Sequence, residues 1–139
     1  LGGLYSTRWS AASPEKVACI YLDNPVCSFS GIGSENLTAA VDAAYGFAGA
    51  AERAAYQETP VHLAGRIARA GIPVLGVVGQ DDRLIPVAQH YDLFEANFKA
   101  AGGVIATLRR QLWGHHPHGL DDPAPIVDFI RRHTPGGGV

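Results

Sequence analysis

Apolar residues along the chain fall into short strand-sized runs, which alternate with longer stretches that carry apolar positions at helical spacing. The short runs are bounded by Gly, Pro, Asn and Asp, as is typical of strands about four to eight residues long. In chain order the pattern predicts a helix over 4–12, a strand over 17–22, a loop over 25–36, two short helices within 37–57, a helix over 61–70, a strand over 72–79, a helix over 87–101, a strand over 104–108 and a helix over 123–133.

This alternation predicts the α/β class, with three parallel strands and helices on both faces of the sheet. The first run, residues 17–22 (VACIYL), is apolar throughout and predicts a strand buried on both faces. Residues 36–70 form a small helical excursion, and the glycine-rich residues 134–139 are expected to fray. Ligands of parallel sheets bind beyond the carboxyl ends of the strands, so a site is expected at the start before Leu4 and at the turns after residues 79 and 108.

The length and net charge of the chain indicate which kinds of binding partner to expect. The chain has 139 residues, the size of one domain or part of one, and its net charge is −2 without any basic run. We therefore expect no nucleic-acid partner, and no membrane span because every apolar run is far shorter than about 20 residues. A small molecule is the expected partner. The chain opens on Leu1 and contains no methionine, so we expect a longer parent protein, whose localisation stays open.

The turn after the second strand carries two adjacent carboxylates, Asp81 and Asp82, between Gly79 and Pro86. A carboxylate at the carboxyl end of a strand can hold an imidazole through its Nδ1 hydrogen and stabilise the imidazolium that forms during proton transfer. Either carboxylate could equally well cap the turn, which is a common role of aspartate. This motif alone leaves both interpretations open.

The turn after the third strand carries His115, His116 and His118. A histidine beside a carboxylate-bearing turn can act as general base and then as general acid. Solvated loop histidines are the plainer alternative, and a transition-metal site that includes Asp121 and Asp122 is a third. The cluster lacks the helix or strand spacing of common zinc sites, so we expect no metal and no cofactor.

Together the two turns place an acid before a histidine, each after a strand of one parallel sheet. The pattern Gly79-x-x-Asp82-x-x-x-Pro86 followed by Gly114-His115 resembles the acid and histidine blocks of the α/β-hydrolase superfamily. Residues 1–3 (LGG) resemble the end of the G-x-S-x-G-G turn that carries the nucleophile in that superfamily. The resemblance covers residues 1–139 and implies the C-terminal half of the fold, beginning just after the serine.

The resemblance also implies roles for individual residues. Asp82 corresponds to the acid, His115 to the catalytic histidine, and the backbone N–H of Leu1 to an oxyanion-hole donor. His116 and His118 would shape the loop or face the substrate. Residues 23–27 (DNPVC) resemble a stretch of a bacterial esterase-like group, which places Asp23 and Asn24 as further substrate-side candidates.

No G-x-S-x-G sequence occurs in the chain, so it has no recognisable nucleophile and we expect it to be inactive alone. Cys27 follows the wrong strand for a nucleophile and is expected to be a small buried hydrophobe, unbridged to Cys19. For the longer parent we expect hydrolysis of a small ester or acyl substrate through an acyl-enzyme. A serine peptidase of the prolyl-oligopeptidase type and a non-catalytic ligand-binding or truncated protein are the alternatives.

The predicted half-sheet leaves apolar surface and an unpaired strand edge. We therefore expect the chain either to self-associate or to bind the missing N-terminal half of the same fold.

Overall fold

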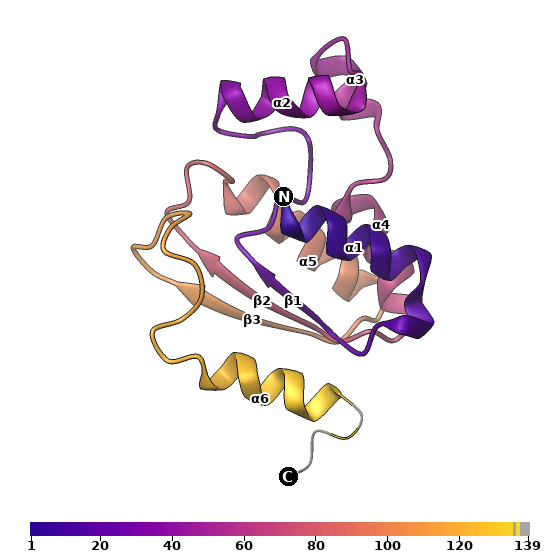
Figure 1. The fold of residues 1–139 in the computed structure, drawn as a ribbon, viewed down its shortest axis with the longest axis vertical. Helices are drawn as coiled ribbons and strands as arrows, with labels where there is room; N and C mark the ends of the chain where they lie inside the picture. The colour runs from indigo at the N-terminus through magenta and orange to yellow at the C-terminus, as the bar shows by residue number, and fades with distance from the viewer. Residues whose placement is uncertain (135, 137–139) are drawn as a thin grey trace.

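In a computed structural model, which describes residues 1–134 and 136, the chain forms an open sheet of three parallel strands flanked by helices (Figure 1). The predicted α/β class is confirmed. The elements are α1 (Gly2–Ala12), the 3-10 turn η1 (Pro14–Lys16), β1 (Ile20–Asp23), α2 (Glu35–Tyr45), α3 (Ala50–Ala55), α4 (Pro60–Arg69), β2 (Val74–Gly79), the 3-10 turn η2 (Val87–Gln89), α5 (Tyr91–Ala100), β3 (Ile105–Arg110) and α6 (Ala124–His133).

The strands lie in the order β1-β2-β3, and β2 pairs with both neighbours. Every residue of β2 is buried. The prediction of burial on both faces is wrong for β1, because Tyr21 and Asp23 are only half-buried. This strand also begins late, at Ile20, since the N–H of Val17 still donates to the carbonyl of Pro14 and closes the preceding 3-10 turn (3.1 Å).

Helices α1, α4 and α5 form a layer on one face of the sheet, and α6 lies on the other face (Figure 1). The layer of three helices encloses the main core, in which burial of large apolar side chains is the dominant stabilising term. Its largest fully buried members are Leu22, Ile67, Val74, Val78, Tyr91, Phe94 and Phe98. In α6 only Phe129 is buried, so the second face of the sheet is thinly covered.

Residues 36–70, expected to form a small helical excursion, cover nearly all of α2 together with α3 and α4. Helix α4 belongs to the helical layer, whereas the pair α2 and α3 lies beyond it (Figure 1). Gly46 separates the two helices in a left-handed conformation with φ 72°, which glycine adopts without strain. Beneath them four aromatic rings pack against one another with centroids 4.7 to 5.7 Å apart. These rings are Phe29, Tyr45, Phe47 and Tyr56.

The helix predicted over 87–101 is divided at His90, whose φ and ψ of −125° and −86° are not helical. The Nδ1 atom of His90 accepts the backbone N–H groups of Cys27 and Ser28, each at 3.2 Å. This contact between segments remote in sequence overrides the local helical preference. Cys19 and Cys27 are both free thiols, as expected.

Of the tail predicted over 134–139, residues 135 and 137–139 lie outside the described residues. None of the described helices is both long and apolar enough to cross a membrane.

Candidate active site

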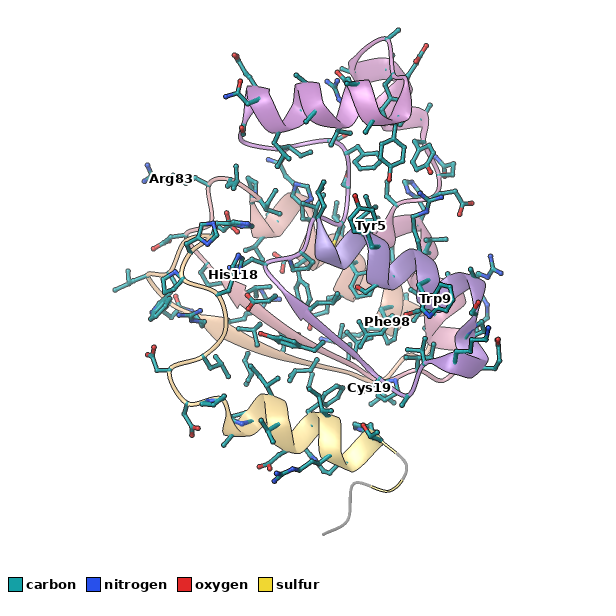
Figure 2. All side chains as sticks on the ribbon, in the orientation of Figure 1. Tyr5, Trp9, Cys19, Arg83, Phe98 and His118 are labelled. Carbon is teal, nitrogen blue, oxygen red and sulfur yellow. The ribbon has the colours of Figure 1, made fainter. Side chains whose placement is uncertain are left out.

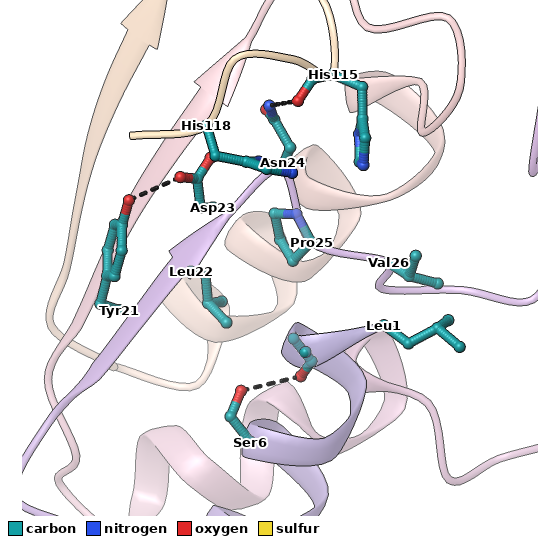
Figure 3. A pocket seen from close by; sticks show the side chains of 12 residues that line it. Leu1, Ser6, Tyr21, Leu22, Asp23, Asn24, Pro25, Val26, His115 and His118 are labelled. Atoms are coloured by element: carbon teal, nitrogen blue, oxygen red, sulfur yellow. Dashed lines mark hydrogen bonds and ion pairs between the residues drawn. The ribbon is translucent and has the colours of Figure 1, made fainter. Parts of the chain in front are cut away.

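A cleft of about 460 Å³ opens at the carboxyl end of β1 and has a volume typical of small-molecule sites (Figure 3). Three segments that are remote in sequence meet there: the start of α1, the end of β1, and the loop between β3 and α6. Its lining residues are Leu1, Gly2, Gly3, Ser6, Tyr21, Leu22, Asp23, Asn24, Pro25, Val26, His115 and His118.

Beside this cleft, Asp82 and His115 form a hydrogen-bonded pair. The Asp82 carboxylate follows β2 and is fully buried, and its Oδ2 lies 2.7 Å from His115 Nδ1. The other oxygen, Oδ1, accepts the backbone N–H groups of Leu84 and Ile85 at 2.9 and 2.8 Å. Because a carboxylate only accepts hydrogen bonds, Nδ1 carries the ring proton and Nε2 is left with its lone pair. The pair therefore has the geometry of an acid that orients a general base.

The neighbouring carboxylate does not reach the histidine. Asp81 is exposed, and its contact with the histidine loop is made by its backbone N–H, which donates to the carbonyl of Trp113 (2.9 Å). Of the two aspartates, Asp82 is thus the one whose carboxylate contacts His115. The catalytic role of Asp82 stays a prediction.

Asn24 fixes the backbone of the histidine loop. Its side-chain Nδ2 donates to the carbonyls of Gly114 and His115 at 3.3 and 3.1 Å, and its Oδ1 accepts the N–H of Gly79 at 2.7 Å. Asn24 is buried, with φ 40°, a left-handed conformation that asparagine tolerates better than most residues. It borders the cleft, but its amide is engaged with backbone rather than free for a ligand, and its substrate-side role stays a prediction.

Asp23 anchors the far side of the same loop. Its Oδ2 accepts the Tyr21 hydroxyl at 2.8 Å and the N–H of Gly119, and its Oδ1 lies 3.4 Å from His118 Nδ1 (Figure 3). Burial, and then the hydrogen bond to Asp23, raise the pKa of the Tyr21 hydroxyl above its ordinary value. Tyr21 therefore stays protonated and keeps donating to Asp23.

Arg110, which the sequence did not single out, is the third anchor. Its guanidinium donates to the carbonyls of Pro117 and Gly119 and lies over the Trp113 ring, 3.1 Å from the centroid. The signal available in the sequence is an arginine at the carboxyl end of a strand, just before an aromatic residue. Together with Asn24 and Asp23, it holds the histidines in a defined loop conformation.

The first turn of α1 borders the cleft through Leu1, Gly2 and Gly3. Backbone N–H groups in the first turn of a helix have no partner within the helix, and the helix dipole favours negative charge there. Gly3 is required for this approach, because a Cβ atom at that position would lie 2.6 Å from the Pro25 Cβ. The arrangement suits a developing anion, as an oxyanion hole requires.

Two side chains that could act as nucleophiles within the described residues, Ser6 and Cys27, form no hydrogen bond with His115. Ser6 borders the cleft, but its hydroxyl donates to the Gly3 carbonyl at 3.2 Å. Cys27 is fully buried, and burial raises the pKa of its thiol, which suits the expected buried hydrophobe.

His116 and His118 lie beside His115, and one ring nitrogen from each of the three falls within 4.8 Å of the others. This is the spatial arrangement that could hold a metal ion. Asp122 instead caps α6, since its Oδ1 accepts the N–H of Ala124 at 2.9 Å, and it lies outside this cluster.

No protein-family model matches the chain, and a search of curated proteins finds no relative.

Proposed function

We propose that this chain supplies the acid and the base of a Ser-His-Asp hydrolase that cleaves a small carboxylic ester or related acyl substrate. The observation that supports this most strongly is the contact between Asp82 Oδ2 and His115 Nδ1, made beside a cleft that Leu1 also lines. In this proposal the serine directly precedes Leu1 in a longer polypeptide, so the nucleophile would enter the same cleft.

In the proposed mechanism His115 takes the serine proton at Nε2 as the serine attacks the substrate carbonyl, and then returns it to the leaving group. Asp82 keeps Nδ1 protonated and stabilises the imidazolium as it forms. Its second oxygen is fixed by two backbone N–H groups, so the carboxylate is oriented before the reaction begins. Water then releases the acyl group by the reverse proton transfers.

The start of α1 would stabilise the tetrahedral intermediate. The N–H of Leu1, the residue after the proposed serine, would donate to the oxyanion, and the N-terminal end of α1 would add favourable potential. The second oxyanion donor would come from the part of the protein that precedes Leu1.

The order of elements supports membership of the α/β-hydrolase superfamily as part of this proposal. The acid follows β2 and the histidine follows β3 in a parallel sheet, with helix α1 beginning where the helix after the nucleophile turn is expected. Among the described strands, the outer edge of β1 is unpaired, which leaves room for a further strand.

A serine-directed fluorophosphonate tests the proposal on the protein extended upstream of Leu1. We expect labelling of one serine immediately before Leu1, strongly slowed by His115→Ala and unaffected by His133→Ala on α6. Absence of labelling at that position would overturn the hydrolase assignment and favour a non-catalytic ligand-binding protein.

A further inference from the structure

The three histidines of the loop after β3 converge more closely than their spacing in the sequence indicates. The ring centroids of His115, His116 and His118 lie 4.5 to 5.1 Å apart, and the rings are nearly perpendicular to one another. One nitrogen from each ring lies within 4.8 Å of the other two. Three imidazole nitrogens close enough to reach one ion are the donor set of an open zinc site.

Two of these rings also have the carboxylate partners that are typical of metal-binding histidines. Such a histidine usually donates its second ring N–H to a carboxylate, which fixes the ring and raises its basicity as a ligand. His115 Nδ1 contacts Asp82 at 2.7 Å, and His118 Nδ1 lies 3.4 Å from Asp23. Both contacts use Nδ1, so Nε2 is the ligand atom of each ring, and both side chains border the cleft (Figure 3).

We propose that His115, His116 and His118 bind one divalent transition-metal ion, with Zn²⁺ as the ion expected, and leave a fourth position open to the cleft. Imidazole ligands favour zinc and its neighbours in the first row over magnesium or calcium. With Zn–N bonds of about 2.0–2.1 Å, nitrogens on a tetrahedral ion lie about 3.4 Å apart, so the cluster must contract slightly. The rings of His116 and His118 are exposed and can turn to supply this contraction.

The metal site shares His115 with the proposed hydrolase. The lone pair of His115 Nε2 cannot bind Zn²⁺ and accept a serine proton at the same time. Zinc would therefore inhibit hydrolysis, a consequence that rests on the proposed function. Metal binding itself does not rest on it, because it can be measured on the chain without any reaction.

Isothermal titration calorimetry of the chain with ZnCl₂ tests the site directly. We expect one Zn²⁺ per chain, with an affinity that falls tenfold or more in His116→Ala and in His118→Ala. Asp23→Asn, which removes the charge beside His118 Nδ1 and also alters the contacts with Tyr21 and Gly119, should weaken binding by about 10-fold to 100-fold. His133→Ala, an exposed histidine on α6, is the matched control and should bind Zn²⁺ as tightly as the unmodified chain.

Circular dichroism of each variant establishes that it remains folded. Loss of affinity in a folded His118→Ala variant, with His133→Ala unchanged, supports the site. The proposal is overturned if no saturable binding occurs, or if His116→Ala and His118→Ala bind Zn²⁺ as tightly as the control. Saturable zinc binding without labelling of the upstream serine would reject the hydrolase proposal alone. Labelling of that serine without saturable zinc binding would reject the metal site alone.

Discussion

Asp82 Oδ2 and His115 Nδ1 lie 2.7 Å apart although 33 residues separate them in the chain. The contact forms because β2 and β3 are adjacent and parallel, so the turns that follow them meet at one edge of the sheet. The carboxylate is fully buried, whereas 19% of the His115 side chain stays exposed, on the side of the cleft. The acid is therefore shielded from solvent, whereas the base is accessible from the cleft.

Gly79 permits this contact by allowing the histidine loop to pass close to the end of β2. A Cβ atom there would lie 2.4 Å from the Gly114 carbonyl oxygen and 2.5 Å from that of Trp113. We expect Gly79→Ala to lower the free energy of unfolding by about 1–3 kcal/mol, as measured by urea denaturation. Gly2→Ala is the control, because a Cβ at Gly2 meets no atom within 4 Å. Equal stability of the two variants would show that the loop does not pack as described.

Asn24 holds the same loop through hydrogen bonds to three backbone groups. Asn24→Ala leaves the buried N–H of Gly79 without its partner, so we expect a loss of about 1–3 kcal/mol in the free energy of unfolding. Hydrogen exchange at the Gly79 amide should accelerate at the same time. Asn36→Ala, on the exposed start of α2, should change neither quantity. Unchanged exchange at Gly79 would contradict the role assigned to Asn24.

His90 makes stability depend on pH. Burial lowers its pKa below the ordinary 6.5, although the nearby Gly31 backbone and the charge of Asp82 oppose the shift. As pH falls below about 6.5, the unfolded chain binds a proton that the folded chain does not, so stability decreases. His90→Asn keeps an acceptor near the Nδ1 position but does not titrate. We expect its free energy of unfolding to fall less steeply between about pH 7 and pH 5. If the free energy of unfolding depends on pH equally steeply in the unmodified chain and in His90→Asn, the role assigned to His90 is wrong.

Leu1, Tyr5 and Trp9, spaced four residues apart at the start of the chain and along α1, form an exposed apolar stripe. Tyr5 is 63% and Trp9 55% exposed, and both are labelled in Figure 2. With the outer edge of β1, which pairs with no other described strand, this stripe supports the expectation that the chain self-associates. In sedimentation velocity we expect Tyr5→Lys and Trp9→Lys to reduce association. Leu112→Lys is the control, at an exposed apolar residue outside the stripe. A monodisperse monomer of the unmodified chain would contradict the expectation.

The alternation of apolar runs and helical patterns predicted the α/β class and the order of the elements, because periodicity reports local burial. The prediction of element boundaries failed for two different reasons. Helix α5 begins at Tyr91 because His90 binds the backbone of Cys27 and Ser28, a contact between remote segments that no local pattern could reveal. The late start of β1 at Ile20 is a local effect, because the N–H of Val17 closes a 3-10 turn with Pro14.

At the candidate site too, the sequence predicted part of the arrangement and the folded structure determines the rest. Chain order paired an acid turn with a histidine turn, and the resemblance to α/β-hydrolases favoured Asp82 over Asp81. The structure adds a physical reason for that choice, because the turn buries Asp82 and leaves Asp81 exposed. The anchoring by Asn24 and Arg110 involves loop carbonyls, which no side-chain motif specifies. The sequence spacing of the histidines argued against a metal site, whereas the folded loop brings their ring nitrogens together.

The most direct test of the proposed acid–base pair compares two adjacent carboxylates. In the protein extended upstream of Leu1, turnover of p-nitrophenyl acetate is measured for Asp82→Asn and for its neighbour, Asp81→Asn. We expect Asp82→Asn to lower kcat by about 10³-fold to 10⁴-fold, because the imidazole loses its orienting carboxylate. Asp81→Asn should leave kcat unchanged, since its exposed side chain does not reach His115. Equal rates for the two variants would contradict the assignment of Asp82 and His115 as the catalytic pair.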